Sequence, residues 1–238
     1  MNIQDRFNQH IRKQQEARKD RKGSGKIKPS GLGQCYRRQI YAIRQEEVTN
    51  PPDITSVKRM LLGTVVHETI QKAYAKTEKE ILVQNDNIKG YADIVGDDYV
   101  SDIKTVSPYA YKWVTKPDID IAEEKKDHWL QVATYGLYLN KPKIRLAFVN
   151  TGNLNQIKEF EQLTKDWHSK VEKEIDKVVC LLGFKGLPDG IPRLYGVDKE
   201  GEPRECQYCN YSTLCFKDKE ERGKFNKLKS PSEAAKEK

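Results

Sequence analysis

Alternating apolar and polar positions predict a β-hairpin near the middle of the chain. Ile88–Val95 and Tyr99–Val106 both show this period-two pattern. The segment between them, Gly96-Asp97-Asp98, consists of residues that favour tight turns. Two alternating runs joined by such a turn are the usual sequence signal of a hairpin.

The hairpin carries a candidate catalytic group. Side chains alternate along a strand, so Asp102 and Lys104 point to the same face and Asp93 can reach them from the neighbouring strand. Two close carboxylates repel each other, and a hard divalent cation relieves that repulsion. A bound metal activates water, and a nearby lysine positions it or neutralises phosphate charge. The alternative is an exposed Asp-x-Lys pair that is simply solvated.

Apolar residues at helical spacing predict three long helices, at about 55–79, 121–141 and 164–182. The first contains His67, which is either a partly buried structural histidine or a ligand. Gly63 lies inside the same helix, where glycine costs about 1 kcal/mol relative to alanine. That cost indicates close packing or close approach of a ligand. The expected apolar face of this helix is Met60, Leu61, Val65, Ile70, Ala73 and Tyr74.

Further strands are predicted at 80–84, 143–150 and 156–162. A short helix is expected after Cys35. In the helix at 121–141, Gln131 and Tyr135 are four residues apart and therefore share a face. On the helix at 164–182, Cys180 is interpreted as a small buried apolar side chain.

Composition favours one polar, intracellular domain. The chain has 238 residues, of which 37% are hydrophobic and 33% charged, enough for one core. The sequence contains no apolar run long enough to span a bilayer, and its first residues lack the apolar core of a signal peptide. We therefore expect a cytoplasmic protein that does not act at a membrane.

Basic charge is concentrated at the two ends of the chain. Residues 1–30 carry a net charge of +6 and residues 216–238 a net charge of +3, out of +8 overall. The expected organisation is a basic flexible tail at 1–28, a folded domain at 29–217 and a charged flexible tail at 218–238. The tails either bind a polyanion or keep the protein soluble.

The cysteines predict a metal site. Cys206, Cys209 and Cys215 form a C-x2-C-x5-C pattern, and three thiolates this close together indicate metal binding. Cys35, in a glycine-rich turn, is a better fourth ligand than Cys180. The spacing does not choose between zinc and an iron–sulfur cluster.

Taken together, these motifs resemble the RecB-like iron–sulfur branch of the PD-(D/E)xK nucleases, which includes CRISPR-associated Cas-type exonucleases and the nuclease domain of AddB. The resemblance runs from about Ser30 to Phe216. Its motifs are a GxxxH, a Gly-x-x-Asp, a (D/E)xK, a QxxxY and four split cysteines. They correspond to Gly63–His67, Gly90–Asp93, Asp102–Lys104, Gln131–Tyr135, and Cys35 with Cys206, Cys209 and Cys215.

The resemblance implies an α/β fold of the restriction-endonuclease type, a mixed central sheet flanked by helices with a C-terminal cysteine-ligated iron–sulfur loop. It implies that His67, Asp93, Asp102 and the Ile103 carbonyl hold Mg²⁺ or Mn²⁺. It also implies that Lys104 orients the attacking water, while Gln131 and Tyr135 contact DNA or support Lys104. The four cysteines would bind a structural [4Fe-4S] cluster. Asp102 departs from the glutamate that many relatives carry.

The function implied is a metal-dependent DNA exonuclease that prefers single strands or ends. The sequence has no GxxxxGK[ST] P-loop, so a helicase, recombination or integration factor would be a separate partner. One alternative is a non-catalytic DNA-binding or assembly subunit with a nuclease fold. Another is a zinc-stapled nucleic-acid-binding module.

Overall fold

A mixed five-stranded sheet forms the centre of the computed structural model, which describes residues 2–19, 23–183, 206 and 208–215. The strand order is β1-β2-β3-β4-β5. Strands β3 and β4 are parallel, and the other neighbours are antiparallel. The predicted hairpin is confirmed as β2 and β3. The strands are β1 Lys79–Gln84, β2 Lys89–Val95, β3 Tyr99–Val106, β4 Lys143–Asn150 and β5 Ile157–Leu163.

Three helices make the crossover that parallel strands β3 and β4 require. They are α4 Pro108–Val114, α5 Ile121–Glu124 and α6 Lys126–Tyr138. The predicted helix at 121–141 is therefore divided in two. Ser107 and Asp120 cap α4 and α5 by accepting backbone N–H groups of the first turn.

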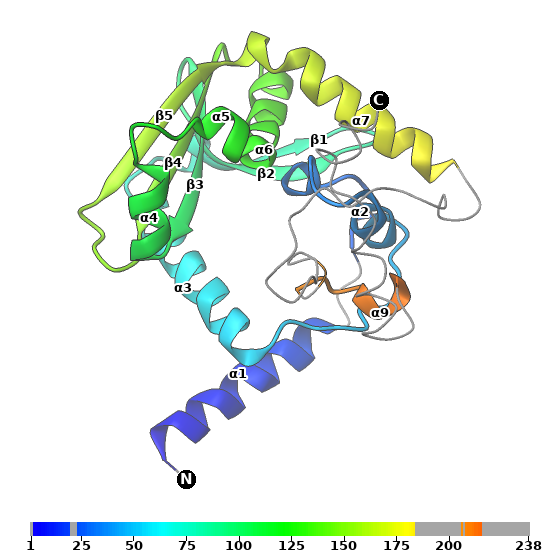
Figure 1. Ribbon diagram of the computed structural model, residues 1–238, viewed down its shortest axis with the longest axis vertical. Helices are drawn as coiled ribbons and strands as arrows, with labels where there is room; N and C mark the ends of the chain where they lie inside the picture. Colours follow the sequence, from blue (N-terminus) through cyan, green and yellow to red (C-terminus); the bar gives the residue numbers. More distant parts are fainter. Residues whose placement is uncertain (1, 20–22, 184–205, 207, 216–238) are drawn as a thin grey trace, which may run out of the picture.

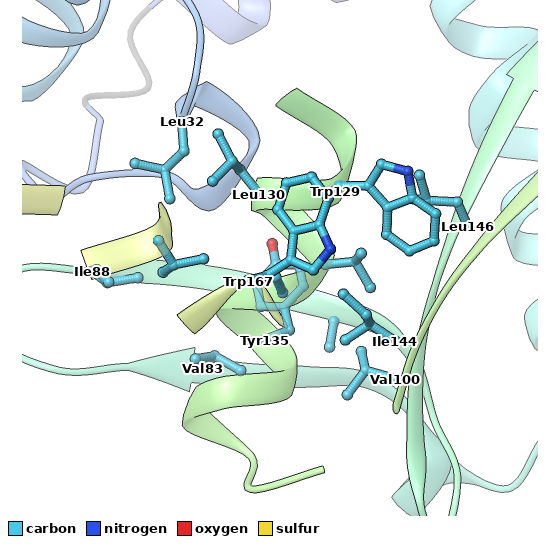
Figure 2. Close-up of a cluster of buried hydrophobic side chains, with 14 of the residues drawn as sticks. Leu32, Val83, Ile88, Val100, Trp129, Leu130, Tyr135, Ile144, Leu146 and Trp167 are labelled. Carbon is cyan, nitrogen blue, oxygen red and sulfur yellow. The ribbon is translucent and has the colours of Figure 1, made fainter. Parts of the chain in front are cut away.

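The main core lies on the face of the sheet that α6 covers. Trp129 of α6 stacks on Trp167, with ring centroids 5.9 Å apart, just before α7 (His168–Leu182) begins. Val100 of β3 and Leu146 of β4 belong to the same cluster, and in Figure 2 Leu146 lies beside the tryptophan rings and Val100 below them. The 3₁₀ turn η1 (Pro29–Gly31) also packs on α6.

Helix α3 (Ile54–Gln71) covers the opposite face of the sheet. Its Val66 packs with Ile103 of β3 and Val149 of β4. A Cβ on Gly63 would lie 3.0 Å from Thr105 Oγ1, so the glycine allows the helix to approach β3 closely. This close approach explains why a glycine stands at position 63 in spite of its energetic cost inside a helix.

The apolar face expected on this helix is mostly wrong. Met60, Leu61 and Val65 are exposed, Met60 by 54%. The helix meets the sheet along the side that carries Gly63 and Val66. Ile70 and Tyr74 of the expected stripe do pack against the cluster around Val66, so the expectation holds at these two residues. The helix also ends at Gln71 rather than near residue 79.

Helix α7 confirms most of the helix predicted at 164–182. Val171, Ile175 and Val178 are buried against the core. Val179 and Cys180 are exposed, so the interpretation of Cys180 as a buried apolar side chain is wrong. Cys180 lies on the opposite side of α7 from these three buried residues.

The expected N-terminal tail contains a helix, α1 (Ile3–Lys19). Helix α1 packs against α3 (Figure 1). Lys58 Nζ of α3 donates to Asn8 Oδ1 at 2.6 Å and lies 4.8 Å from the Phe7 ring centroid. Ile11 is buried, which an irregular tail would not achieve.

Regular structure also begins before residue 29, the expected start of the folded domain. Ile27 is buried and forms a bridge to Ile88, donating its N–H to the Asn87 carbonyl at 2.8 Å. Residues 20–22 and the expected tail at 218–238 lie outside the described residues. Within the described part of the chain, no helix has the length and apolar character needed to cross a membrane.

Packing of α1 predicts that Ile11→Ala destabilises the protein by about 2–5 kcal/mol, the usual cost of truncating a buried isoleucine. Ile3→Ala on the same helix is the matched control, because Ile3 is 88% exposed and Ile11 only 1%. Urea unfolding of both variants measures the difference. Equal stability of the two variants would show that α1 is not docked.

Candidate active site

The candidate site lies where β2 and β3 separate. Their pairing in register covers only Ile94 with Ser101 and Val95 with Val100. Beyond these pairs, the Asp93 carboxylate accepts the Ile103 backbone N–H at 2.8 Å. A side chain thus takes the ladder position that a carbonyl normally fills.

The backbone carbonyl of Asp93 accepts a hydrogen bond from a side chain of α3. Gln71 Nε2 donates to the Asp93 carbonyl at 3.2 Å. His67, one turn earlier on α3, places Nδ1 3.6 Å from Asp93 Oδ2. Burial lowers the pKa of His67, which favours the neutral imidazole that binds metals.

Asp102, Lys104 and Gln131 form a polar chain on the other face of the sheet. Lys104 Nζ lies 2.7 Å from Asp102 Oδ2 and donates to Gln131 Oε1 at 2.8 Å. Asp102 and Lys104 therefore share a face, as the hairpin pattern predicted. Asp102 is only 1% exposed, so this ion pair is not a solvated surface pair.

Tyr135 approaches the site from α6. Burial, followed by the charge of Asp102, raises the pKa of its phenol, so the hydroxyl stays protonated. A Cβ on Gly90 would lie 2.7 Å from Tyr135 Oη and 2.8 Å from Pro29 Cδ. The glycine of the Gly-x-x-Asp motif is thus explained by the close approach of a tyrosine hydroxyl.

Buried negative charge dominates the electrostatics. Burial raises the pKa of Asp102, Lys104 opposes that rise and the neighbouring Asp93 adds to it, and the net result is a pKa of about 6. Burial also raises the pKa of Asp93, while the Ile103 N–H opposes it. Lys104 alone does not compensate for the burial of these two carboxylates.

The donor atoms suit Mg²⁺ or Mn²⁺, which prefer oxygen and imidazole nitrogen ligands. They are the carboxylates of Asp93 and Asp102, the Ile103 carbonyl and the His67 imidazole. Across 2–19, 23–183, 206 and 208–215, no group of three or more His, Cys, Asp or Glu side chains is arranged to hold a metal ion. In the structure, the Asp102 carboxylate pairs with Lys104, and the Asp93 carboxylate accepts the Ile103 N–H.

The cysteine-rich segment packs against the N-terminal part of the fold. Tyr211 lies beside Tyr41 of α2 (Tyr36–Ile43), with ring centroids 5.5 Å apart. Asn50 Nδ2 donates to the Cys209 carbonyl at 3.0 Å. Cys35 is the N-cap of α2, so the structure brings the two cysteine-bearing segments to the same helix.

Three of the four expected ligands, Cys35, Cys206 and Cys209, are buried. Cys215 ends α9 (Ser212–Cys215), and its thiol lies 3.8 Å from the Tyr41 hydroxyl. The described contacts are those of packing and hydrogen bonding. Ligation of a cluster or of zinc by these thiols therefore stays a prediction.

Sequence reasoning missed His128 of α6. Its ring lies against Phe148 of β4, with centroids 6.3 Å apart. Its spacing of three residues from Gln131 was the only available signal, since it places both side chains on the same side of the helix.

The sequence matches no protein-family model and no curated protein sequence. Among solved structures the fold is similar to that of SSO0001, with a TM-score of 0.52 and 19% identity over 90% of this chain and 96% of that one. It is also similar to LHK-Exo, an alkaline exonuclease from Laribacter hongkongensis, with a TM-score of 0.50 and 13% identity. That match covers 66% of this chain and 88% of the exonuclease, and LHK-Exo in complex with dAMP gives the same values.

These comparisons define a class of fold. The chain shares the α/β fold of an alkaline exonuclease, with a mixed sheet and flanking helices. The expected mixed sheet is therefore confirmed. The identities are low enough that the likeness concerns the fold alone.

Burial of Asp102 predicts that Asp102→Asn stabilises the metal-free protein at neutral pH. Folding raises the pKa of Asp102 from its ordinary 3.8 to about 6, so the folded state holds the proton more tightly between these values. The stability of the unchanged protein should therefore fall relative to the variant as the pH rises from about 4 to about 6. Urea unfolding in EDTA measures this difference.

Asp98→Asn is the control of opposite sign. The exposed Asp98 has a lowered pKa because it pairs with Lys143. Its charged form therefore stabilises the fold above its unfolded pKa, and that contribution is lost as the pH falls. An Asp102→Asn variant that is less stable than the unchanged protein at pH 7 would contradict the electrostatics described above.

Proposed function

We propose that this chain is a divalent-metal-dependent deoxyribonuclease that degrades DNA from its ends. The observation that carries this proposal is the convergence of Asp93, Asp102, Lys104 and Gln131 where two strands separate. The likeness of the fold to an alkaline exonuclease, also crystallised with dAMP, supports the same reaction class.

His67, Asp93, Asp102 and the Ile103 carbonyl are the residues that would hold Mg²⁺ or Mn²⁺. Bound there, the metal would lower the pKa of a water and stabilise charge on a phosphoryl oxygen. The protein supplies the arrangement around it. Gln131 holds the Lys104 ammonium at 2.8 Å, where it can orient the attacking water or neutralise phosphate charge.

Tyr135 and Gln131 would contact the DNA backbone or support Lys104. The protonated Tyr135 hydroxyl can donate a hydrogen bond to a phosphate oxygen. A single strand or a DNA end is the proposed substrate, because it brings one backbone to a site enclosed by α3 and α6. A helicase, recombination or integration factor is the kind of partner that would supply such a strand.

Cys35, Cys206, Cys209 and Cys215 are proposed to bind a structural [4Fe-4S] cluster, with zinc as the alternative. The burial of three of these thiols and the packing of the C-terminal segment on α2 support this proposal. A four-thiolate centre would link the start of the folded domain to its end. Its role would be to stabilise the fold.

Lys104→Ala should reduce cleavage of end-labelled single-stranded DNA in Mn²⁺ or Mg²⁺ by about 100-fold or more, the scale of losing one preorganised charge-stabilising group. EDTA should abolish cleavage by the unchanged protein. Lys143→Ala is the matched control, since Lys143 forms an exposed ion pair with Asp98 on the same sheet. It should leave cleavage unchanged.

The shape of the substrate tests the exonuclease assignment. Circular single-stranded DNA of the same sequence should resist degradation by an enzyme that needs an end. Equal cleavage by the Lys104→Ala variant would show that the active site lies elsewhere. DNA binding without metal-dependent cleavage would instead indicate a non-catalytic subunit.

Cys35→Ala should lose the bound cluster, whereas Cys180→Ala should keep it. Cys180 is the matched control because it is exposed on α7 and outside the proposed ligand set. Iron, acid-labile sulfide and zinc are measured in anaerobically purified protein. Zinc without iron in the unchanged protein would select the alternative metal, and retention of metal by Cys35→Ala would exclude Cys35 as a ligand.

A further inference from the structure

Helix α6 presents three polar side chains in one stripe toward the sheet. His128, Gln131 and Tyr135 are three and four residues apart, which places them on adjacent turns of one face. Tyr135 reaches Gly90 of β2 and Gln131 reaches Lys104 of β3. His128 extends this stripe to β4, where its ring meets Phe148.

The position of His128 beside Lys104 follows from strand register. Phe148 and Lys104 are direct partners across the parallel strands β4 and β3. Partner residues of neighbouring strands project to the same face of the sheet. The imidazole that contacts Phe148 therefore lies next to the lysine side chain, and the charge of Lys104 contributes to lowering the pKa of His128.

The two nitrogens of His128 differ in their surroundings. Nε2 lies 3.8 Å from Asp127 Oδ2. Nδ1 is buried and has no hydrogen-bond partner among the residues that the structure describes. Burial lowers the pKa of His128 to about 4, so the ring is neutral and carries one N–H. The nearby carboxylate favours that hydrogen on Nε2, which leaves Nδ1 as an acceptor.

Lys104 needs a second acceptor if Asp102 binds a metal. Its ammonium contacts only Asp102 and Gln131 among the side-chain hydrogen bonds and ion pairs of the described residues. A divalent cation on Asp102 would repel the ammonium and occupy the carboxylate. A buried acceptor without a partner is costly. His128 Nδ1 is such an acceptor, and it lies one turn of α6 away from Gln131, which already accepts a hydrogen bond from Lys104.

We propose that His128 is a positioning residue for Lys104, and that its Nδ1 accepts a hydrogen bond from the Lys104 ammonium when a divalent cation takes Asp102. This inference rests on the proposed function, because it assumes a metal at Asp102. The nearby Asp127 carboxylate favours the tautomer in which Nδ1 is an acceptor. Gln131 and His128 together then keep the ammonium beside the reacting phosphate while Asp102 serves the metal.

Two substitutions separate this role from simple packing. His128→Phe keeps an aromatic ring against Phe148 but removes the acceptor. His128→Asn shortens the ring but keeps an oxygen near the position of Nδ1. We expect His128→Phe to lower kcat by about tenfold or more, the scale of a hydrogen bond to a charged group, with little change in KM for DNA. His128→Asn should restore most of kcat.

Mn²⁺ binding to the full-length protein gives a readout that does not need turnover. Without the second acceptor, Lys104 stays on Asp102 and competes with the metal. His128→Phe should therefore weaken Mn²⁺ binding several-fold in calorimetry. In a Lys104→Met background the same substitution should have no effect, since the competing ammonium is gone. This double-mutant cycle isolates the coupling between the two residues.

The outcomes distinguish the inference from the proposed function. An equal effect of His128→Phe on Mn²⁺ affinity with and without Lys104 would overturn the inference alone. So would a pattern in which the Phe variant is fully active and the Asn variant is inactive, since that is the pattern of a packing role. Absence of both Mn²⁺ binding and metal-dependent cleavage in the unchanged protein would overturn the inference and the proposed function together.

Discussion

The hydrogen bond from the Ile103 N–H to the Asp93 carboxylate is the contact on which the site depends. It takes the place of a backbone ladder bond and ends the pairing of β2 with β3 after two pairs in register. The carboxylate is thereby held inside the sheet instead of above it. Gln71 satisfies the Asp93 carbonyl that the interrupted ladder leaves, so the opening costs few unpaired backbone groups. Side chains from both faces of the sheet can therefore reach the place where β2 and β3 separate.

Two helices use that access from opposite sides. Helix α3 brings His67 to Asp93, and Gly63 allows it to lie close to β3. Helix α6 brings Gln131 and Tyr135 to the other face, where Gly90 leaves room for the tyrosine hydroxyl. The two glycines act in the same way, because each removes a Cβ where another group must pass. The site is therefore a property of packing between α3, α6 and the two strands β2 and β3, and cannot be assigned to the hairpin alone.

The sequence predicted the strands well and the exposed faces of the helices less well. Alternation located β2 and β3, and the strand predicted at 143–150 has the same bounds as β4. The stripe expected on α3 failed because a run such as Met60, Leu61 and Val65 fits more than one helical face, and only the contact with the sheet decides which face is buried. Helix α1 was missed because its polar composition hides the burial of Ile11. His128 was missed because a lone histidine forms no pattern until its neighbours in space are known.

Two Asp–Lys pairs on the same sheet decide how the Asp-x-Lys motif should be interpreted. Lys143 and Asp98 pair at 2.8 Å with side chains 37% and 51% exposed, and they are solvated charge. Lys104 and Asp102 pair at 2.7 Å, but the Asp102 side chain is 2% exposed and its pKa is raised in spite of the lysine. A pair whose only role was stability would gain little from such burial, because desolvation of the carboxylate outweighs the attraction. The same burial strengthens the interaction of Asp102 with any cation placed beside it. The proposed metal site would account for the energetic cost of burying Asp102, because a bound cation would offset it. The solvated pair of Lys143 and Asp98 carries no such cost.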